Sequence, residues 1–359
     1  MKIANSLEAV RRKRGLSASS LAASVGVSRQ TIYAIESGSY VPNTAIGLQL
    51  ARTLEVTVED LFSLPASSVR TERVVLLPGS EPGQPVRLCR IGERLIASAS
   101  SPLQWQLPSG DAVMIGGNKA RLCDGDADFG NRILIAGCDP GISVLARHMR
   151  MAGVEPILAQ RNSTQALSLL KSGSVHIAGT HLRDEASGES NIPEIGRVFP
   201  KNSVALFSFA VWEEGILTAA GNPKGVRGIE DFSRQDVCIV NREKGAGSRI
   251  LLDVRLKKLK IGAGKVRGYR NLAPGHMAAA WEVRTGAVDC CVATRAAARA
   301  FGLGFIPLES ERYDFAIRRG HLDLPAIQTL LNTLNRSGFR RELDSTGGYD
   351  TSVSGRRMM

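Results

Sequence analysis

Short segments with apolar residues at helical spacing follow one another along the first part of the chain. Ile3, Leu7 and Val10 form the first segment, since residues three to four positions apart share one face of a helix. Ser17 and Ser28 precede two further segments, and serine is a preferred residue directly before a helix. Gly26 lies between these two segments, where a tight turn requires a positive φ. The pattern predicts two short helices joined by a glycine-containing turn, as in a helix-turn-helix motif.

The second helix of this pair is predicted to expose a polar face, because Ile32 and Ile35 take the inner positions. Arginine and glutamine suit the base edges of the DNA major groove, whereas serine and asparagine suit phosphates, which fix the position of a protein on DNA. The predicted DNA-binding residues are Ser28, Arg29, Gln30, Tyr33, Ala34, Ser37 and Asn43. The alternative is a helical module that binds protein, with the run Arg11–Arg14 as a solvated face.

The segment VSRQTIYAIESG, with the following helical stretches Ala51–Leu54 and Val58–Leu61, resembles the lambda-repressor-like (XRE) family of helix-turn-helix domains. The resemblance implies that double-stranded DNA is a partner. It also implies that base readers lie near the start of the recognition helix, here Arg29 and Gln30, with Ala34 one turn later. Because two-fold symmetric operators match dimeric helix-turn-helix proteins, we expect a homodimer.

The composition changes after this all-α domain, which we place at residues 1–64. Four short runs of β-type residues follow, at Val74–Leu77, Val86–Leu88, Arg94–Ala97 and Ala112–Ile115, and pairs of proline and glycine separate them. This punctuation predicts hairpins. We expect a small β-rich subdomain or linker over residues 65–130, with Trp105 as an anchor and with no chemistry of its own.

Strand patterns alternate with helical patterns from Asn131 onwards, which predicts an α/β domain with a mainly parallel sheet. The predicted strands are Arg132–Gly137, Val154–Leu158, Val175–Gly179, Val237–Val240 and Val288–Val292. The predicted helices are Ile142–Met151, Ser163–Leu170, Ser248–Leu256 and Ala296–Phe301. The length of this domain, residues 131–355, allows two lobes.

Ligands of such sheets bind at the carboxyl ends of the strands, against helix N-termini. Hydroxyl and guanidinium groups at these positions, together with free backbone N–H groups, favour an anionic ligand. The predicted ligand-binding residues are Asp139, Ser163, Thr164, Thr180, His181, Arg242, Gly247, Ser248 and Arg249. His181 and His276 can equally be hydrogen-bonded structural residues, and the glycines around position 246 a plain turn.

The segments IAGTHLRDEASGESN, NREKGAGSRILLD and GGYDTSVSG resemble the periplasmic-binding-protein-like domain of the molybdate-binding type, over about Asn131–Gly355. The resemblance implies a two-lobed (type II) fold that closes around a small ligand. It suggests an oxyanion such as molybdate as that ligand. In bacteria this type of domain occurs as a ligand sensor fused to DNA-binding domains.

Composition adds limits to this interpretation. The net charge of +12 favours polyanionic partners. The six cysteines form no C-x-x-C pair, so we expect reduced thiols and neither a metal nor a cofactor. The longest apolar run, Val204–Trp212, is too short to cross a membrane. Without an apparent signal peptide, we expect a cytoplasmic protein with no membrane partner.

The function predicted from these patterns is a ligand-responsive transcription regulator rather than an enzyme. The sequence lacks a G-x-S-x-G elbow, an H-E-x-x-H site and a phosphate-binding loop of the Walker type. The alternative is an oxyanion-handling or cofactor-biosynthesis enzyme built on the C-terminal α/β domain, with Asp139, His181 or Arg249 in the reaction.

Overall fold

The computed structural model describes residues 3–63, 70–78, 81–100, 109–125, 127–184 and 187–359. Trp105, the predicted anchor of the middle segment, lies outside these residues. The chain forms two compact units, one of residues 1–71 and 122–127 and the other of residues 72–121 and 128–359. The predicted boundaries at 64 and 130 stay predictions. Among the described helices, none combines the length with the apolar character that crossing a bilayer requires.

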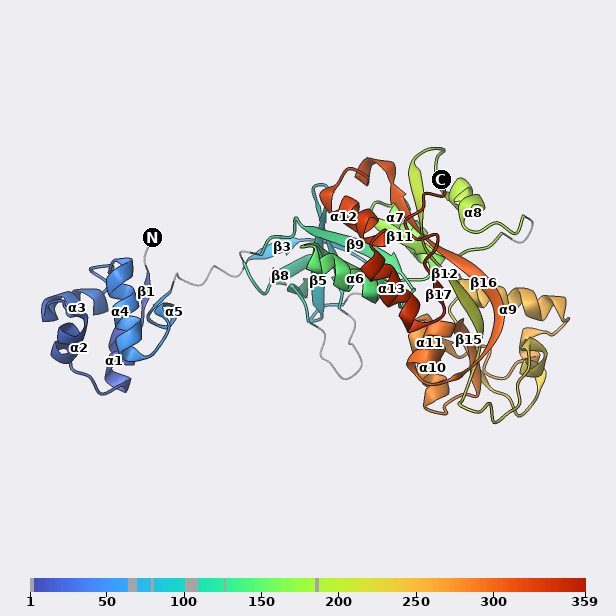
Figure 1. Ribbon diagram of the computed structural model, residues 1–359, viewed down its shortest axis with the longest axis horizontal. Helices are drawn as coiled ribbons and strands as arrows, with labels where there is room; N and C mark the ends of the chain where they lie inside the picture. The colour runs from blue at the N-terminus through green and yellow to red at the C-terminus, as the bar shows by residue number, and fades with distance from the viewer. Residues whose placement is uncertain (1–2, 64–69, 79–80, 101–108, 126, 185–186) are drawn as a thin grey trace. The chain divides into compact units, whose positions relative to one another are not determined.

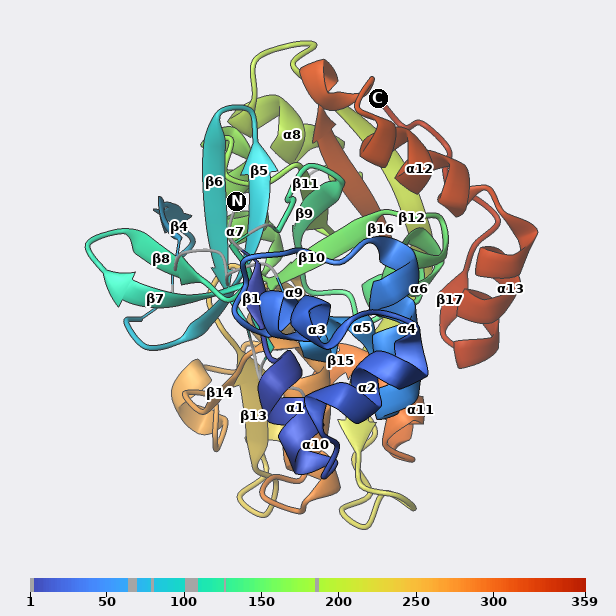
Figure 2. The same ribbon diagram turned by 90° about the vertical axis from the view of Figure 1, so that its left-hand side faces the viewer.

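The first unit is a bundle of short helices, which Figures 1 and 2 show in two views. Its elements are β1 (Ala4–Asn5), α1 (Leu7–Lys13), α2 (Ala18–Val25), α3 (Arg29–Glu36), α4 (Thr44–Leu54), α5 (Val58–Leu61) and β2 (Phe62–Ser63), where β1 and β2 pair antiparallel. Ser17 and Ser28 cap α2 and α3 by accepting a backbone N–H in the first turn. Gly26 has a φ of +68° between them. The predicted helix-turn-helix is therefore confirmed.

A buried ion pair ties α1 to the end of α3. Arg11 Nε lies 2.5 Å from Glu36 Oε1, and Arg11 Nη1 donates to the Leu16 carbonyl at 2.9 Å. Both side chains are less than a tenth exposed. The alternative that treated Arg11–Arg14 as a solvated face is therefore wrong for Arg11, which is part of the core of the bundle.

The middle segment forms a six-stranded sheet, and the predicted β-rich character is confirmed. Its strands are β3 (Thr71–Arg73), β4 (Val75–Leu76), β5 (Pro85–Ile91), β6 (Arg94–Ala99), β7 (Ala112–Gly116) and β8 (Lys119–Leu122), in the order β3-β8-β7-β5-β6-β4. The β5–β6 hairpin stands out in Figure 2. Asp111 connects this sheet to the α/β domain, because its carboxylate accepts from Arg87 and Arg132 at 3.1 and 2.6 Å.

The α/β domain is built on a nine-stranded sheet. Its strands are β9 (Arg132–Gly137), β10 (Glu155–Gln160), β11 (Ile177–Thr180), β12 (Val204–Thr218), β13 (Ile239–Arg242), β14 (Leu272–Ala273), β15 (Cys290–Thr294), β16 (Gly304–Arg318) and β17 (Tyr349–Asp350). Its α-helices are α6 (Ile142–Met151), α7 (Ser163–Lys171), α8 (Ile192–Val198), α9 (Gly247–Lys258), α10 (Gly275–Arg284), α11 (Arg295–Ala300), α12 (Pro325–Leu334) and α13 (Ser337–Thr346).

Two long strands join the two halves of this domain. β12 and β16 pair antiparallel along their whole length: Val204 lies opposite Arg318 at one end, and Thr218 lies opposite Gly304 at the other. Both strands run through the domain in Figure 1. We call the part with β9, β10 and β11 the first lobe and the part with β13, β14 and β15 the second lobe. Pairing within each of these sets is parallel. The expected parallel sheet is therefore present within each lobe, whereas the ribbon shared by the lobes is antiparallel.

Candidate ligand-binding cleft and DNA-binding helix

Helix α3 presents the predicted base readers to solvent. Arg29, Gln30 and Tyr33 are exposed, and Ile32 and Ile35 are fully buried on the opposite face. The Arg29 guanidinium lies 5.3 Å from the centre of the Tyr33 ring, and its Nη2 donates to the Tyr33 hydroxyl at 3.0 Å. The two side chains therefore form one exposed donor-bearing surface at the start of the helix.

The other predicted DNA contacts surround this surface. Ala34 is half-buried. Ser28 accepts the Thr31 N–H at 3.0 Å, and Asn43 accepts the Ile46 N–H at 3.0 Å as the cap of α4. Ser37 donates to the Ala34 carbonyl at 3.1 Å. Each cap binds one first-turn N–H group of its helix. The other first-turn N–H groups of α3 and α4 are donors of the kind that contact phosphates.

A cavity of about 280 Å³ lies between the two lobes of the α/β domain. Its walls come from the segment after β11, from α9 and from β16. The lining residues are His181, Leu182, Arg183, Asp184, Gly188, Gly247, Ile250, Leu251, Val254, Arg255, Lys258, Glu309 and Glu311. Of the nine predicted ligand-binding residues, His181 and Gly247 line this cavity and the other seven do not.

His181 lies at the inner end of this cavity and is almost fully buried. Its Nδ1 lies 2.7 Å from Glu311 Oε2, and its Nε2 lies 3.5 Å from Cys138 Sγ. The backbone N–H of His181 donates to Ser163 Oγ at 3.2 Å. The ring also meets Trp212 edge-on, with centroids 4.8 Å apart. Both nitrogens of the imidazole are thus engaged from the first lobe and the shared ribbon.

The second lobe brings a matching set of polar side chains. Glu214 is fully buried on β12 and accepts the Ser248 hydroxyl at 2.6 Å. His276 Nδ1 lies 3.7 Å from the same Glu214 oxygen. Arg242, at the end of β13, donates through Nε and Nη2 to Glu243 at 3.1 and 3.2 Å. These groups lie near His181. We call them, together with His181 and the adjacent Cys138, Asp139, Trp212 and Glu311, the polar cluster.

Several atoms of this cluster have no hydrogen-bond partner among the described residues. They are Arg242 Nη1, Trp212 Nε1, both ring nitrogens of His276, Glu214 Oε2 and Asp139 Oδ2. A buried polar group without a partner costs about 1–3 kcal/mol, and such groups in native proteins call for an explanation. The residues that carry these atoms are buried beside His181 and do not line the cavity itself. Several such atoms close together indicate a site built for a ligand.

Burial sets the protonation of the cluster. It raises the pKa of Glu214 to about 7, and the nearby Glu311 carboxylate adds to that rise. Burial also lowers the pKa of His276 well below its usual value, and the charge of Arg242 lowers it further. Burial also acts to lower the pKa of His181, but the interactions of its ring with Cys138 and Glu311 outweigh that effect and raise the pKa well above its usual value.

The remaining predicted residues have partners of their own. Thr180 donates to Asn191 at 3.2 Å, and Thr164 donates to the Gly245 carbonyl across the lobes at 3.1 Å. Arg249 donates to Asp253 at 2.9 Å and stacks on Tyr269 at 4.2 Å. Asp139 Oδ1 accepts from the Tyr349 hydroxyl at 2.7 Å, and burial raises the pKa of Asp139 to about 7.

Sequence reasoning missed four members of the cluster. Cys138 lies beside the predicted Asp139, and Trp212, Glu214 and Glu311 come from the long antiparallel strands. The available signal was the apolar run Val204–Trp212, whose strand continues to Thr218. His276, for which a structural role was favoured over a ligand role, lies in the first turn of α10.

Comparisons with known proteins agree with this architecture. A family model described as a PBP superfamily domain matches residues 146–335, and a helix-turn-helix model matches residues 7–61. The uncharacterized protein YvgK of Bacillus subtilis is 28% identical over 307 residues, which are 85% of this chain and 97% of that protein. The uncharacterized HTH-type transcriptional regulator YgzD of the same organism is 38% identical over 60 residues, 17% of this chain and 91% of that one.

Among solved structures, a putative phosphate ABC transporter substrate-binding protein with bound phosphate from Clostridium perfringens is similar to 61% of this chain and 98% of its own length. Its sequence identity is 10% and its TM-score is 0.48.

Proposed function

Since the chain belongs to the PBP superfamily and carries a helix-turn-helix domain at its N-terminus, we propose that it is a ligand-responsive transcription regulator. In this proposal α3 binds operator DNA and the interlobe cleft binds a small effector without turning it over. The observation that carries the effector site is the set of buried, unpartnered polar atoms between the lobes. The protein would act where the DNA is, in the cytoplasm.

We infer further that the effector is anionic, for example an oxyanion such as molybdate. Arg242 Nη1 and Trp212 Nε1 are buried donors without an acceptor among the described residues. The N-cap residues of α9 and α10, Ala246 and Pro274, make no side-chain capping hydrogen bond, so the first N–H groups of these helices add donors and a positive partial charge. Glu214, with its pKa near 7, is partly protonated at neutral pH and repels an anion less than a full carboxylate would.

The effector would act by favouring closed lobes. A ligand shifts a conformational equilibrium only by the difference between its affinities for the two states, and a cleft lined from both lobes is complete only when closed. A homodimer would place two copies of α3 one DNA turn apart, about 34 Å. We therefore expect a pseudo-palindromic operator whose occupancy changes when the effector binds.

Calorimetry on the full chain tests this proposal with molybdate, sulfate and phosphate as probes. A specific oxyanion should bind and raise the melting temperature, by mass action. Arg242→Gln should weaken that binding at least tenfold, whereas Arg284→Gln, an exposed residue at the end of α10, should leave it unchanged. The anionic effector would be ruled out if all three anions gave no heat and no thermal shift. Equal binding by Arg242→Gln would remove the cleft as their site.

A further inference from the structure

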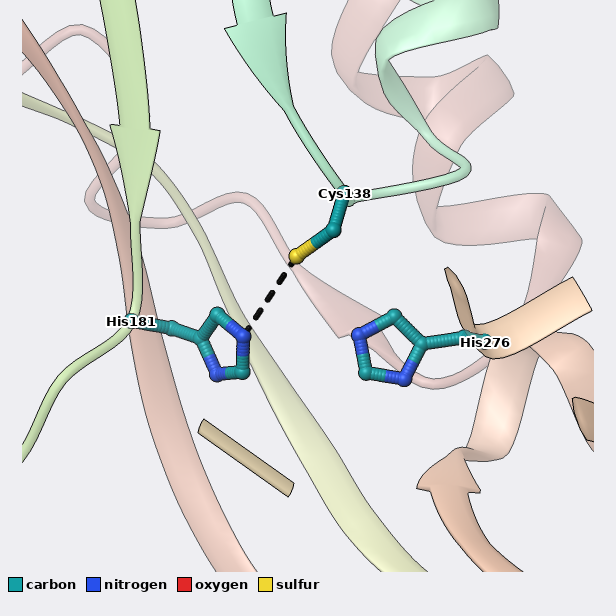
Figure 3. A group of neighbouring side chains, drawn as sticks. All are labelled: Cys138, His181 and His276. Carbon is teal, nitrogen blue, oxygen red and sulfur yellow. Dashed lines mark hydrogen bonds between the residues drawn. The ribbon is translucent and has the colours of Figure 1, made fainter. Parts of the chain in front are cut away.

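Three side chains that combine a thiol with two imidazoles converge at the inner end of the cleft. Cys138 Sγ and one ring nitrogen each of His181 and His276 all lie within 4.8 Å of one another, and all three residues are buried. Figure 3 shows the three side chains pointing toward a common centre. They come from the segments after β9 and β11 and from the first turn of α10.

The orientation of His181 suits a metal ligand. Glu311 holds Nδ1 at 2.7 Å and so presents Nε2 to Cys138 Sγ at 3.5 Å. Metal-binding histidines commonly donate their other ring nitrogen to a carboxylate, which fixes the ring and strengthens the ligand. A metal ion would take the place of the proton that Sγ and Nε2 now share.

His276 supplies an independent observation. The side chain is about 1% exposed, and neither ring nitrogen has a hydrogen-bond partner among the described residues. Nδ1 lies 3.7 Å from Glu214 Oε1, while Figure 3 shows the other ring nitrogen facing Cys138 and His181. A buried imidazole with both nitrogens unpartnered is costly, and a metal at the common centre would remove that cost on one side.

We propose that Cys138, His181 and His276 bind a divalent transition metal of the zinc class. Thiolate and imidazole ligands select zinc or copper over magnesium and calcium. Zinc–ligand distances of about 2.0–2.3 Å in a tetrahedron place sulfur and nitrogen about 3.5 Å apart, which the Cys138–His181 pair already matches. His276 needs to approach the pair by about an ångström to complete the set.

The surrounding charges favour this cation. Glu311 lies behind the His181 ring and Glu214 behind the His276 ring, and Glu311 together with the Cys138 thiolate would offset the charge of the metal. Glu214 also accepts from Ser248, so the two carboxylates act as supports for the histidines in this proposal.

The site differs from the clustered zinc motifs that a sequence scan detects, because its ligands lie far apart in the sequence. The expectation of no metal was drawn from the missing C-x-x-C pairs, and the proposed site runs against that expectation. Three protein ligands leave a fourth position of a tetrahedral metal open to water or an anion. Cys138 and His181 belong to the first lobe and His276 to the second, so the metal would also clamp the lobes together.

Metal titrations of the untagged, metal-free full chain test this inference without any oxyanion present. We expect one Zn²⁺ per chain. Co²⁺ should give thiolate-to-metal charge-transfer absorption and tetrahedral d–d bands. Cys138→Ser and His276→Gln should abolish the charge-transfer band and the tetrahedral bands respectively, and each should weaken Zn²⁺ binding at least a hundredfold. Glu311→Gln, a supporting change, should weaken it about 10–100-fold.

Cys89→Ser is the matched control, because Cys89 is also buried and lies 3.9 Å from a histidine, His176, yet lies outside the proposed site. It should bind like the wild type. Circular dichroism of each metal-free variant shows whether it is folded. Zn²⁺ should also protect Cys138, but not the exposed Cys123, from alkylation by iodoacetamide. Zinc stoichiometry that survives both Cys138→Ser and His276→Gln would overturn the inference.

The inference goes beyond the proposed function and fails separately from it. Arg242→Gln should lose the oxyanion but keep the metal. Loss of both oxyanion binding and operator binding, with an intact zinc site, would reject the proposed function alone. A protein that binds oxyanion and operator but never binds Zn²⁺ or Co²⁺ at Cys138 would reject the metal site alone.

Discussion

The Cα of Gly247, the first residue of α9, packs directly against the imidazole ring of His181. A Cβ atom built at position 247 would come within 2.4 Å of His181 Cε1 and 2.6 Å of its Nδ1. The two residues belong to different lobes, and His181 is held by Glu311 and Cys138. The absence of a side chain at position 247 is therefore what allows the lobes to meet this closely.

Gly247→Ala should hinder closure of the cleft. Overpacking of this kind costs about 1–3 kcal/mol, which corresponds to a loss of effector affinity of roughly 5- to 150-fold. Gly262→Ala is the control, because a Cβ there meets no atom within 4 Å. Calorimetric titration of both variants measures the effect, and equal affinities would show that closure does not bring Gly247 onto His181.

Arg29→Ala and Gln30→Ala should relax operator preference rather than simply weaken DNA binding. Each bidentate base contact contributes about 1–3 kcal/mol of discrimination, and both side chains are exposed at the start of α3. Arg52→Ala, an exposed arginine near the end of α4, is the control. Selection from a random operator library gives the preference of each variant. An unchanged preference would exclude these residues as readers.

Glu36→Gln should destabilise the helical bundle by about 3–5 kcal/mol, because it leaves the buried Arg11 charge without its partner. Glu8→Gln breaks the exposed Arg12–Glu8 pair within α1, the helix that carries Arg11. This change should lower the free energy of unfolding by at most about 1 kcal/mol. The double change Arg11→Met with Glu36→Leu should recover much of the loss. Thermal unfolding followed by circular dichroism measures the series, and similar values for the two single variants would contradict the structural role of Arg11.

Acid should weaken the attachment of the six-stranded sheet through Asp111. Burial alone would raise the pKa of Asp111, but hydrogen bonds from Arg132 and the Leu88 N–H, with the charge of Arg87, hold that pKa below its usual value. A lowered folded-state pKa gives stability that is present above the unfolded pKa, about 3.9, and is lost as the pH falls through the folded value.

Asp111→Asn should therefore cost about 1–3 kcal/mol at neutral pH, and the difference from the wild type should shrink below about pH 4. Urea unfolding between pH 7 and pH 3 provides the measurement. Asp323→Asn, an exposed position, should show no such trend. If the difference in the free energy of unfolding between the wild type and Asp111→Asn stays constant down to pH 3, the charge of Asp111 does not contribute to stability.

The sequence predicted the first lobe closely. Arg132–Gly137 and Ile142–Met151 have the same bounds in the structure, because each is a single apolar pattern that ends at a glycine or a polar turn. The long strands were not predicted, since polar residues interrupt their patterns. Glu214 is fully buried in β12, and no hydrophobicity rule expects a buried carboxylate within a strand.

The contrast between parallel strands and long antiparallel strands also decides how much of the cleft could be predicted. His181, Arg242 and Gly247 lie where the rule for parallel sheets places ligands, at the carboxyl ends of strands. Trp212 and Glu311 lie within antiparallel strands, to which that rule does not apply. Their convergence on His181 depends on tertiary pairing, and residues so far apart in sequence give no local pattern.

The register of β12 against β16 shifts between Ser208 and Ala210 and again between Glu214 and Gly215, on either side of Trp212. Irregularities of this kind bend a strand and increase its twist. In the proposed regulator, the two-stranded ribbon that belongs to both lobes would bend most easily at these two points, on either side of Trp212. If the effector acts by closing the lobes, as proposed, the bending stiffness of this ribbon would set the effector concentration that closes them, and residues that never contact the effector could change that concentration.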